Sequence, residues 1–136
     1  MRESYVGEKD AAINVSGLPP RVNRWYGVKN DIETKIIAGE YGDAEKLPSI
    51  TELAQLYDIG TTTAQKVLKA LCDDGIIYKK HGVGYYVKVF VKDQLRKQHT
   101  EEFEGRVIDL FDYASQIGLT RGEIIEIVNG VIGNRG

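Results

Sequence analysis

The feature that most constrains the fold of this chain is a pair of helical patterns separated by only three residues. Ser49 and Glu52 form a Ser-x-x-Glu capping box, which predicts a helix that begins after Ser49 and ends near Asp58. The turn "DIG" then leads into "TTTAQKVLKALCDDG", whose apolar residues share one helical face and whose Gly75 predicts the helix end. Two short helices joined by a tight turn indicate a helix-turn-helix unit.

The residues that follow this unit predict a β-hairpin with a basic tip. In "IIYKKHGVGYYVKVFV", two runs of β-branched and aromatic residues flank the turn. Gly82 and Gly84 permit positive φ angles there, and Lys79, Lys80 and His81 come directly before them. A hairpin directly after a helix-turn-helix predicts a winged helix-turn-helix. The alternative is a solvated hairpin whose lysines only protect its edges.

Helical periodicity extends to both sides of this region. Apolar residues at helical spacing predict a first helix from Trp25 to Gly39, which a loop joins to the capping box. The fold class that we expect is therefore mainly α with a small β-hairpin. Its parts are an irregular N-terminal arm at 1–20, a winged helix-turn-helix domain at 21–91, and a two-helix extension at 92–136.

The extension predicts an antiparallel helix pair. Residues 92–104 are polar and fit either a linker or the polar start of a helix, and a second capping box at Thr120 and Glu123 predicts where the last helix begins. A helix pair this short cannot bury two apolar faces by itself, and we therefore expect a dimer interface there. The alternative is that these faces pack only within their own subunit. The candidate dimerisation residues are Val107, Leu110, Phe111, Ala114, Ile117, Ile124, Ile125 and Val128.

Composition limits the classes of function. The formal net charge is −2, yet five lysines and two aspartates between residues 61 and 91 give that region a local net charge of +3. A single cysteine excludes an intramolecular disulfide, and the two histidines are not spaced with further metal ligands. No catalytic triad order or phosphate-binding loop indicates an enzyme, so we expect neither catalysis nor a cofactor. With no apolar run of membrane-spanning length and no signal peptide, we expect a soluble, cytoplasmic protein.

As a set, the motifs resemble the DNA-binding domain of the GntR family of bacterial transcription regulators, and the short extension resembles its YtrA-like subfamily. This resemblance implies a dimeric regulator, usually a repressor, that binds a roughly palindromic operator. The chain departs from the family at two DNA-contacting positions, because Thr51 replaces an Arg and Gly60-Thr61-Thr62-Thr63 replaces the usual Ser-Arg-x-Thr. The shared elements are Leu47-Pro48-Ser49, Glu52-Leu53-Ala54, Thr63, Leu68, Leu71, Gly75-Ile76-Ile77, Gly82-x-Gly84 and Val87.

The second helix of a helix-turn-helix places its N-terminal end against base edges in the major groove. Threonine and glutamine side chains can hydrogen-bond these edges, and lysine reaches guanine or phosphate. Helix N-termini also favour phosphate, although a pure capping role for Ser49 and a turn role for the threonines are alternatives. The candidate DNA-binding residues are Ser49, Thr51, Thr61, Thr62, Thr63, Gln65, Lys66, Lys79, Lys80, His81, Gly82 and Gly84.

Two other functions stay open at this point. A winged helix can serve as a protein-interaction module, and a ligand-responsive sensor can have weak intrinsic DNA binding. The partners that we expect are double-stranded DNA and a second copy of the chain, with an unidentified small-molecule effector as an option.

Overall fold

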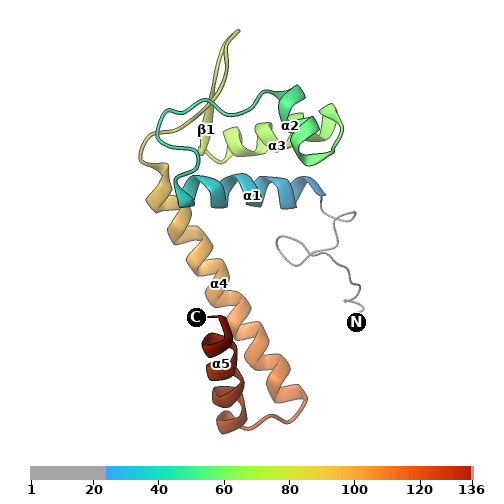
Figure 1. Cartoon of the computed structure of the whole chain (residues 1–136), viewed down its shortest axis with the longest axis vertical. Coiled ribbons are helices and arrows are strands. Elements are labelled where there is room, and N and C mark those ends of the chain that lie inside the picture. Colours follow the sequence, from blue (N-terminus) through green and yellow to red (C-terminus); the bar gives the residue numbers. More distant parts are fainter. Residues whose placement is uncertain (1–23, 136) are drawn as a thin grey trace. The chain divides into compact units, whose positions relative to one another are not determined.

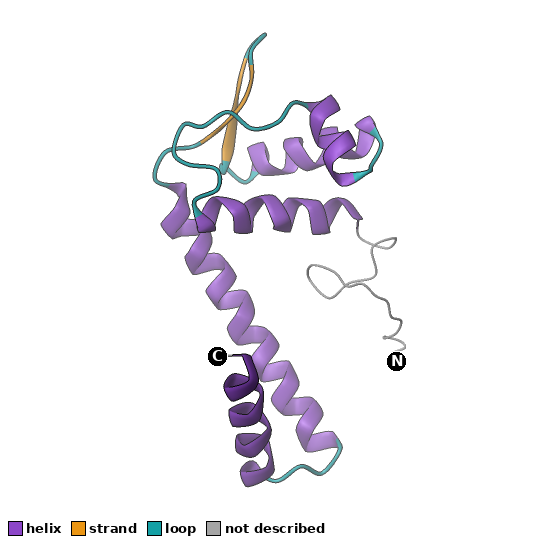
Figure 2. Cartoon of the chain, viewed as in Figure 1, coloured by secondary structure: helices purple, strands orange, loops and turns teal. Residues whose placement is uncertain are grey.

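A computed structural model describes residues 24–135, so the arm expected at 1–20 lies outside the described residues. Over this part of the chain, five helices and one two-stranded antiparallel sheet confirm the mainly α fold class with a small hairpin (Figure 1, Figure 2). The elements are α1 (Arg24–Ala38), α2 (Ile50–Tyr57), α3 (Thr61–Asp73), β1 (Ile77–Lys80), β2 (Gly84–Val87), α4 (Val91–Gln116) and α5 (Arg121–Arg135). Within α4, between Arg96 and Lys97, the chain divides into two compact units.

The helix-turn-helix begins at the predicted capping box. The Oγ atom of Ser49 accepts a hydrogen bond from the Glu52 amide at 3.1 Å, and the Ser49 amide donates to Glu52 Oε1 at 2.8 Å. The helix α2 ends at Asp58, which has left-handed φ and ψ angles of 53° and 53°. The amide of Ile59 then donates to the Ala54 carbonyl at 2.9 Å. This cap turns the chain sharply, so that α3 follows almost immediately.

The core of the first unit is built around α3. The helices α1 and α2, the hairpin and the start of α4 all contribute apolar side chains to one buried cluster. From α4, Val91 and Leu95 are 2% and 0% exposed, so the first turns of that helix belong to this core. One face of α3 is completely buried, and its other side chains are exposed or half-buried. The fully buried residues of α3 are Ala64, Val67, Leu68 and Leu71.

The hairpin is broader than predicted, because a segment before α2 pairs with it. The strands β1 and β2 are antiparallel, with Ile77 opposite Val87. Residues 44–47 run along the free edge of β2, where the Leu47 amide donates to the Tyr85 carbonyl at 2.8 Å. The sequence predicted only a loop here, since pairing between distant segments leaves no local signal.

The second unit is formed by the rest of α4 and by α5. Residues 92–104, for which linker and helix were alternatives, are helical. The second predicted capping box is confirmed, because the Thr120 amide donates to Glu123 Oε1 at 2.8 Å and the Glu123 amide donates to Thr120 Oγ1 at 3.2 Å. Of the described residues in this unit, Ala114 alone is buried.

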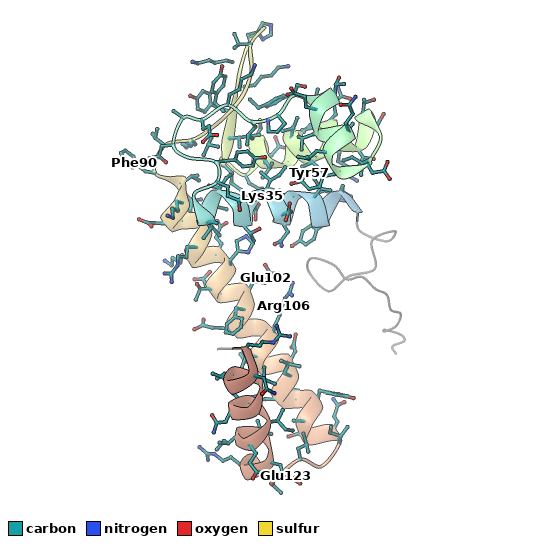
Figure 3. The ribbon with its side chains drawn as sticks, viewed as in Figure 1. Lys35, Tyr57, Phe90, Glu102, Arg106 and Glu123 are labelled. Carbon is teal, nitrogen blue, oxygen red and sulfur yellow. The ribbon has the colours of Figure 1, made fainter. Side chains whose placement is uncertain are left out.

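Two polar clusters fasten α1 to the helix-turn-helix. The Tyr57 hydroxyl donates to Asp31 Oδ2 at 2.6 Å, and Lys35 Nζ lies 3.2 Å from the same carboxylate oxygen (Figure 3). At the other end, Lys29 Nζ lies 2.8 Å from Asp74, the C-cap residue of α3. Burial, followed by the hydrogen bond to Asp31, raises the pKa of the Tyr57 phenol.

Replacing Tyr57 with Phe should lower the free energy of unfolding by about 1 to 2 kcal/mol at pH 7, because the change removes a part-buried hydrogen bond to a carboxylate. Since the pKa of the phenol is raised on folding, its stabilisation is complete below its ordinary value of 10.0 and is lost as the pH rises above that. Urea unfolding should therefore show a steeper loss of stability above pH 10 in the wild type than in Tyr57→Phe. Tyr113→Phe, at an exposed position of α4, is the control; parallel pH profiles for wild type and Tyr57→Phe would contradict this role.

Candidate nucleic-acid interface

The N-terminal end of α3 presents polar side chains to solvent. Thr61, Thr62 and Gln65 are exposed, and Thr63 is half-buried. The N-cap residue is Gly60, which has no side chain to cap the helix, so no threonine occupies the N-cap position itself. These polar groups lie off the fully buried face of α3, and the end of the helix expected to meet bases is therefore open.

Lys66 is also exposed, but its ammonium has a partner in α1. Its Nζ atom lies 4.7 Å from the ring centroid of Trp25, which is half-buried at the start of α1. A cation over an indole face is attracted by the ring quadrupole and keeps its charge. The structure thus places Lys66 on α3 and beside α1, and the predicted contact of Lys66 with DNA stays a prediction.

At the start of α2, Ser49 and Thr51 are both exposed. The capping role of Ser49 is confirmed, while the DNA contacts of these two residues stay predictions. Hydrogen bonds from the backbone and side chain of Ser49 lower the pKa of Glu52. A charged carboxylate in the first turn suits the positive end of the α2 dipole.

The tip of the wing, formed by β1, β2 and the turn between them, is exposed and basic. Lys79, Lys80, His81 and Gly82 are exposed, and Gly84 is half-buried. Gly82 and Gly84 have φ angles of 74° and 151°, so the predicted need for positive φ at this turn is confirmed. Because the two glycines have no side chains, another molecule could approach the backbone of this turn closely.

Tyrosines beside these lysines were absent from the predicted site. Lys80 Nζ lies 4.6 Å from the ring centroid of Tyr86, Lys79 Nζ lies 5.8 Å from that of Tyr85, and the rings of Tyr78 and Tyr86 stack at 5.8 Å. Such contacts orient an ammonium without neutralising it. The sequence holds a signal for them, because residues at equal distances from a hairpin turn lie opposite each other, as Lys79 and Tyr85 do, and diagonal neighbours such as Lys80 and Tyr86 are also within reach.

The lysines between residues 61 and 91 differ in whether a carboxylate already pairs with them. Lys69 Nζ lies 2.9 Å from Asp73, and Lys29 from α1 is paired with Asp74. Both aspartates between residues 61 and 91 are therefore paired, and the charge of Lys69 is offset by that of Asp73. Among the described residues, the lysines of this region without a carboxylate partner are Lys66, Lys79, Lys80 and Lys88.

Three of the eight predicted dimerisation residues are buried or half-buried within the single chain. Ala114 is 6% exposed, and Val107 and Ile124 are half-buried. The other five are large, apolar and between 44% and 63% exposed, which is unusual for a surface without a partner. These five are Leu110, Phe111, Ile117, Ile125 and Val128.

Other kinds of site find no support in the part of the chain that the structure covers. Residues 24–135 contain no group of three or more metal-ligating side chains. The same residues form no helix with the length and apolar character needed to cross a membrane.

Comparisons with known proteins agree with this geometry. The family model "Bacterial regulatory proteins, gntR family" matches residues 26–87. A GntR family transcriptional regulator from Listeria monocytogenes is 25% identical, with a TM-score of 0.70 over 83% of this chain and 98% of that chain. The fold is shared by a transcriptional regulator from Oenococcus oeni (17% identity, TM-score 0.68, 89% and 98% covered) and a GntR family regulator from Bacteroides thetaiotaomicron (22%, 0.64, 83% and 99%). No curated protein gives a significant sequence match.

The contact between Lys66 and Trp25 can be tested through the fluorescence of the single tryptophan of the chain. Lys66→Ala removes the side chain that lies over the indole ring, so acrylamide should quench Trp25 with a higher rate constant. Lys69→Ala, which removes an exposed lysine paired on α3, should leave quenching unchanged. Equal quenching in the wild type and Lys66→Ala would show that this lysine does not cover the ring.

Proposed function

Because residues 26–87 place the chain in the GntR family of bacterial regulatory proteins, we propose that it is a sequence-specific repressor that binds a roughly palindromic operator as a homodimer. The family consists of regulators, and catalysis forms no part of the proposal. With double-stranded DNA as its partner, the protein would act in the cytoplasm.

The observation that carries this proposal is the open N-terminal end of α3, on a helix whose other face is fully buried. A major groove admits one such helix and brings its first residues nearest the bases. Gln65 suits a paired contact with adenine, and Thr61 and Thr62 suit phosphates, base edges or the methyl group of thymine. Since α3 contains no arginine, we expect a readout that depends less on guanine than an arginine-led helix does.

The wing supports the proposal through its charge. Lys79 and Lys80 are exposed, and tyrosine rings orient their ammonium groups. Lysines that replace condensed cations on DNA gain affinity through counterion release, whatever the base sequence. The recognition helix would therefore provide specificity, and the wing a large part of the sequence-independent affinity.

The homodimer is supported by the exposed apolar residues of α4 and α5. A helix pair of this length buries little apolar surface on its own, and a second copy of the same pair would cover the five exposed residues Leu110, Phe111, Ile117, Ile125 and Val128. A two-fold dimer would also present two recognition helices to two half-sites, which explains why the operator should be palindromic.

Selection of an operator from random DNA tests the function directly, and two variants separate its parts. Gln65→Ala should weaken discrimination at one base pair by about 1 to 3 kcal/mol. Lys80→Ala should weaken binding to all sequences alike and reduce the slope of log affinity against log salt by about 0.9.

Gln94→Ala, at an exposed position of α4, is the matched control and should bind like the wild type. If Gln65→Ala lost the same affinity on every DNA, its assignment to base reading would be wrong. If the wild type selected no sequence at all, the proposed function itself would be refuted.

The proposed dimer can be tested on the full chain in the absence of DNA. Leu110→Glu together with Phe111→Lys should give monomers, because charges would be buried in the interface. Asp112→Lys, an exposed charge change on the same helix, should stay dimeric. Light scattering gives the mass of each variant; a persistent dimer of the double variant would place the interface elsewhere.

A further inference from the structure

Lys46 lies in the segment that pairs with β2, and no sequence signal pointed to it. Lys46 forms a bridge with Tyr86, and its neighbour Leu47 is 2% exposed within the core. Successive side chains of an extended segment point to opposite faces, so the burial of Leu47 directs Lys46 outward. Lys46 is accordingly exposed.

The side chain of Lys46 lies against the tip of the wing. A Cβ atom placed on Gly84 would lie 2.9 Å from Lys46 Cε and 3.8 Å from Lys46 Nζ. The glycine therefore leaves room for the lysine stem as well as for the turn. The ammonium of Lys46 is thus beside the strand residue that pairs with Lys80, at the basic end of the hairpin.

Lys46 also forms no ion pair within the described residues, unlike several lysines of the first unit. Lys29, Lys35 and Lys69 each form an ion pair, whereas Lys46 has none among residues 24–135. The helix α2 contains no basic residue, and its one charged side chain is Glu52. After the hydrogen bonds with Ser49, the charge of Lys46 contributes to lowering the pKa of Glu52, so Lys46 also acts at the start of α2.

We propose that Lys46 contacts a DNA phosphate and links the basic wing to the N-terminal end of α2 in one phosphate-binding surface. This inference rests on the proposed DNA-binding function. The ammonium group is a compact charge on a flexible stem, which suits a phosphate oxygen and carries no sequence information. The surface comprises three lysines and two exposed residues at the N-terminal end of α2. They are Lys46, Lys79, Lys80, Ser49 and Thr51.

Titration of the selected operator with salt tests the role of Lys46. Lys46→Met retains an unbranched stem beside Gly84 but removes the charge, and Lys46→Arg retains the charge. Lys46→Met should bind about fivefold more weakly near 0.15 M salt and lower the salt slope by about 0.9, on operator and nonspecific DNA alike. Lys46→Arg should restore the slope. Lys92→Met removes an exposed charge from the start of α4 and should leave the slope unchanged.

The outcomes separate this inference from the function on which it depends. A wild type that selects no operator refutes the proposed function. A wild type that binds DNA, together with a Lys46→Met variant that has the same affinity and slope, overturns the role of Lys46 alone. Equal losses in Lys46→Met and Lys92→Met would also overturn it, because they would reflect net charge and not a contact. If Lys46→Met lost affinity and Lys46→Arg did not restore it, the phosphate contact would be refuted, and Lys46 would be assigned to packing against the wing.

Discussion

The burial of one face of α3 is the constraint on which the rest of the first unit depends. Ala64, Val67, Leu68 and Leu71 have no exposed surface, so rotation of the helix about its own axis would expose several of them at a cost of about 1.5 to 3 kcal/mol for each large side chain. The polar residues of α3 are therefore held in a single orientation. A recognition surface made of flexible side chains needs such a rigid support, since the backbone beneath them determines which side chains can reach a base edge together.

The contacts around α3 preserve that orientation at both ends. At its C-terminal end, the C-cap residue Asp74 pairs with Lys29 of α1. At the other end, the left-handed Asp58 turns the chain from α2, while Tyr57 is hydrogen-bonded to Asp31 of α1. The wing depends on the same core, because Ile77 and Val87 are both buried in it. Helix and wing therefore share one hydrophobic core.

Much of this arrangement was predictable, because its signals are local. Both capping boxes lie where Ser49 and Thr120 predicted them, since each joins residues within one helical turn. The glycines of the wing likewise marked a turn that needs positive φ. The contacts of Lys46 with Gly84 and of Lys66 with Trp25 were not predicted, because they join segments that are distant in the sequence. Periodicity found the apolar stripe that includes Ala114, but could not show which of its residues are covered within a single chain.

Ion pairing changes the meaning of the local charge. The excess of three positive charges between residues 61 and 91 includes Lys69, which Asp73 offsets, while Asp74 is satisfied by a lysine outside that region. No arginine occurs between residues 25 and 95, so the positively charged contacts that this region can offer DNA are single-point ammonium contacts. With few such contacts, the proposed binding to one half-site would be weak. Linking two half-sites through a dimer raises the affinity by making the second binding event intramolecular. The proposed interface on α4 and α5 would then be as necessary for operator binding as the recognition helix.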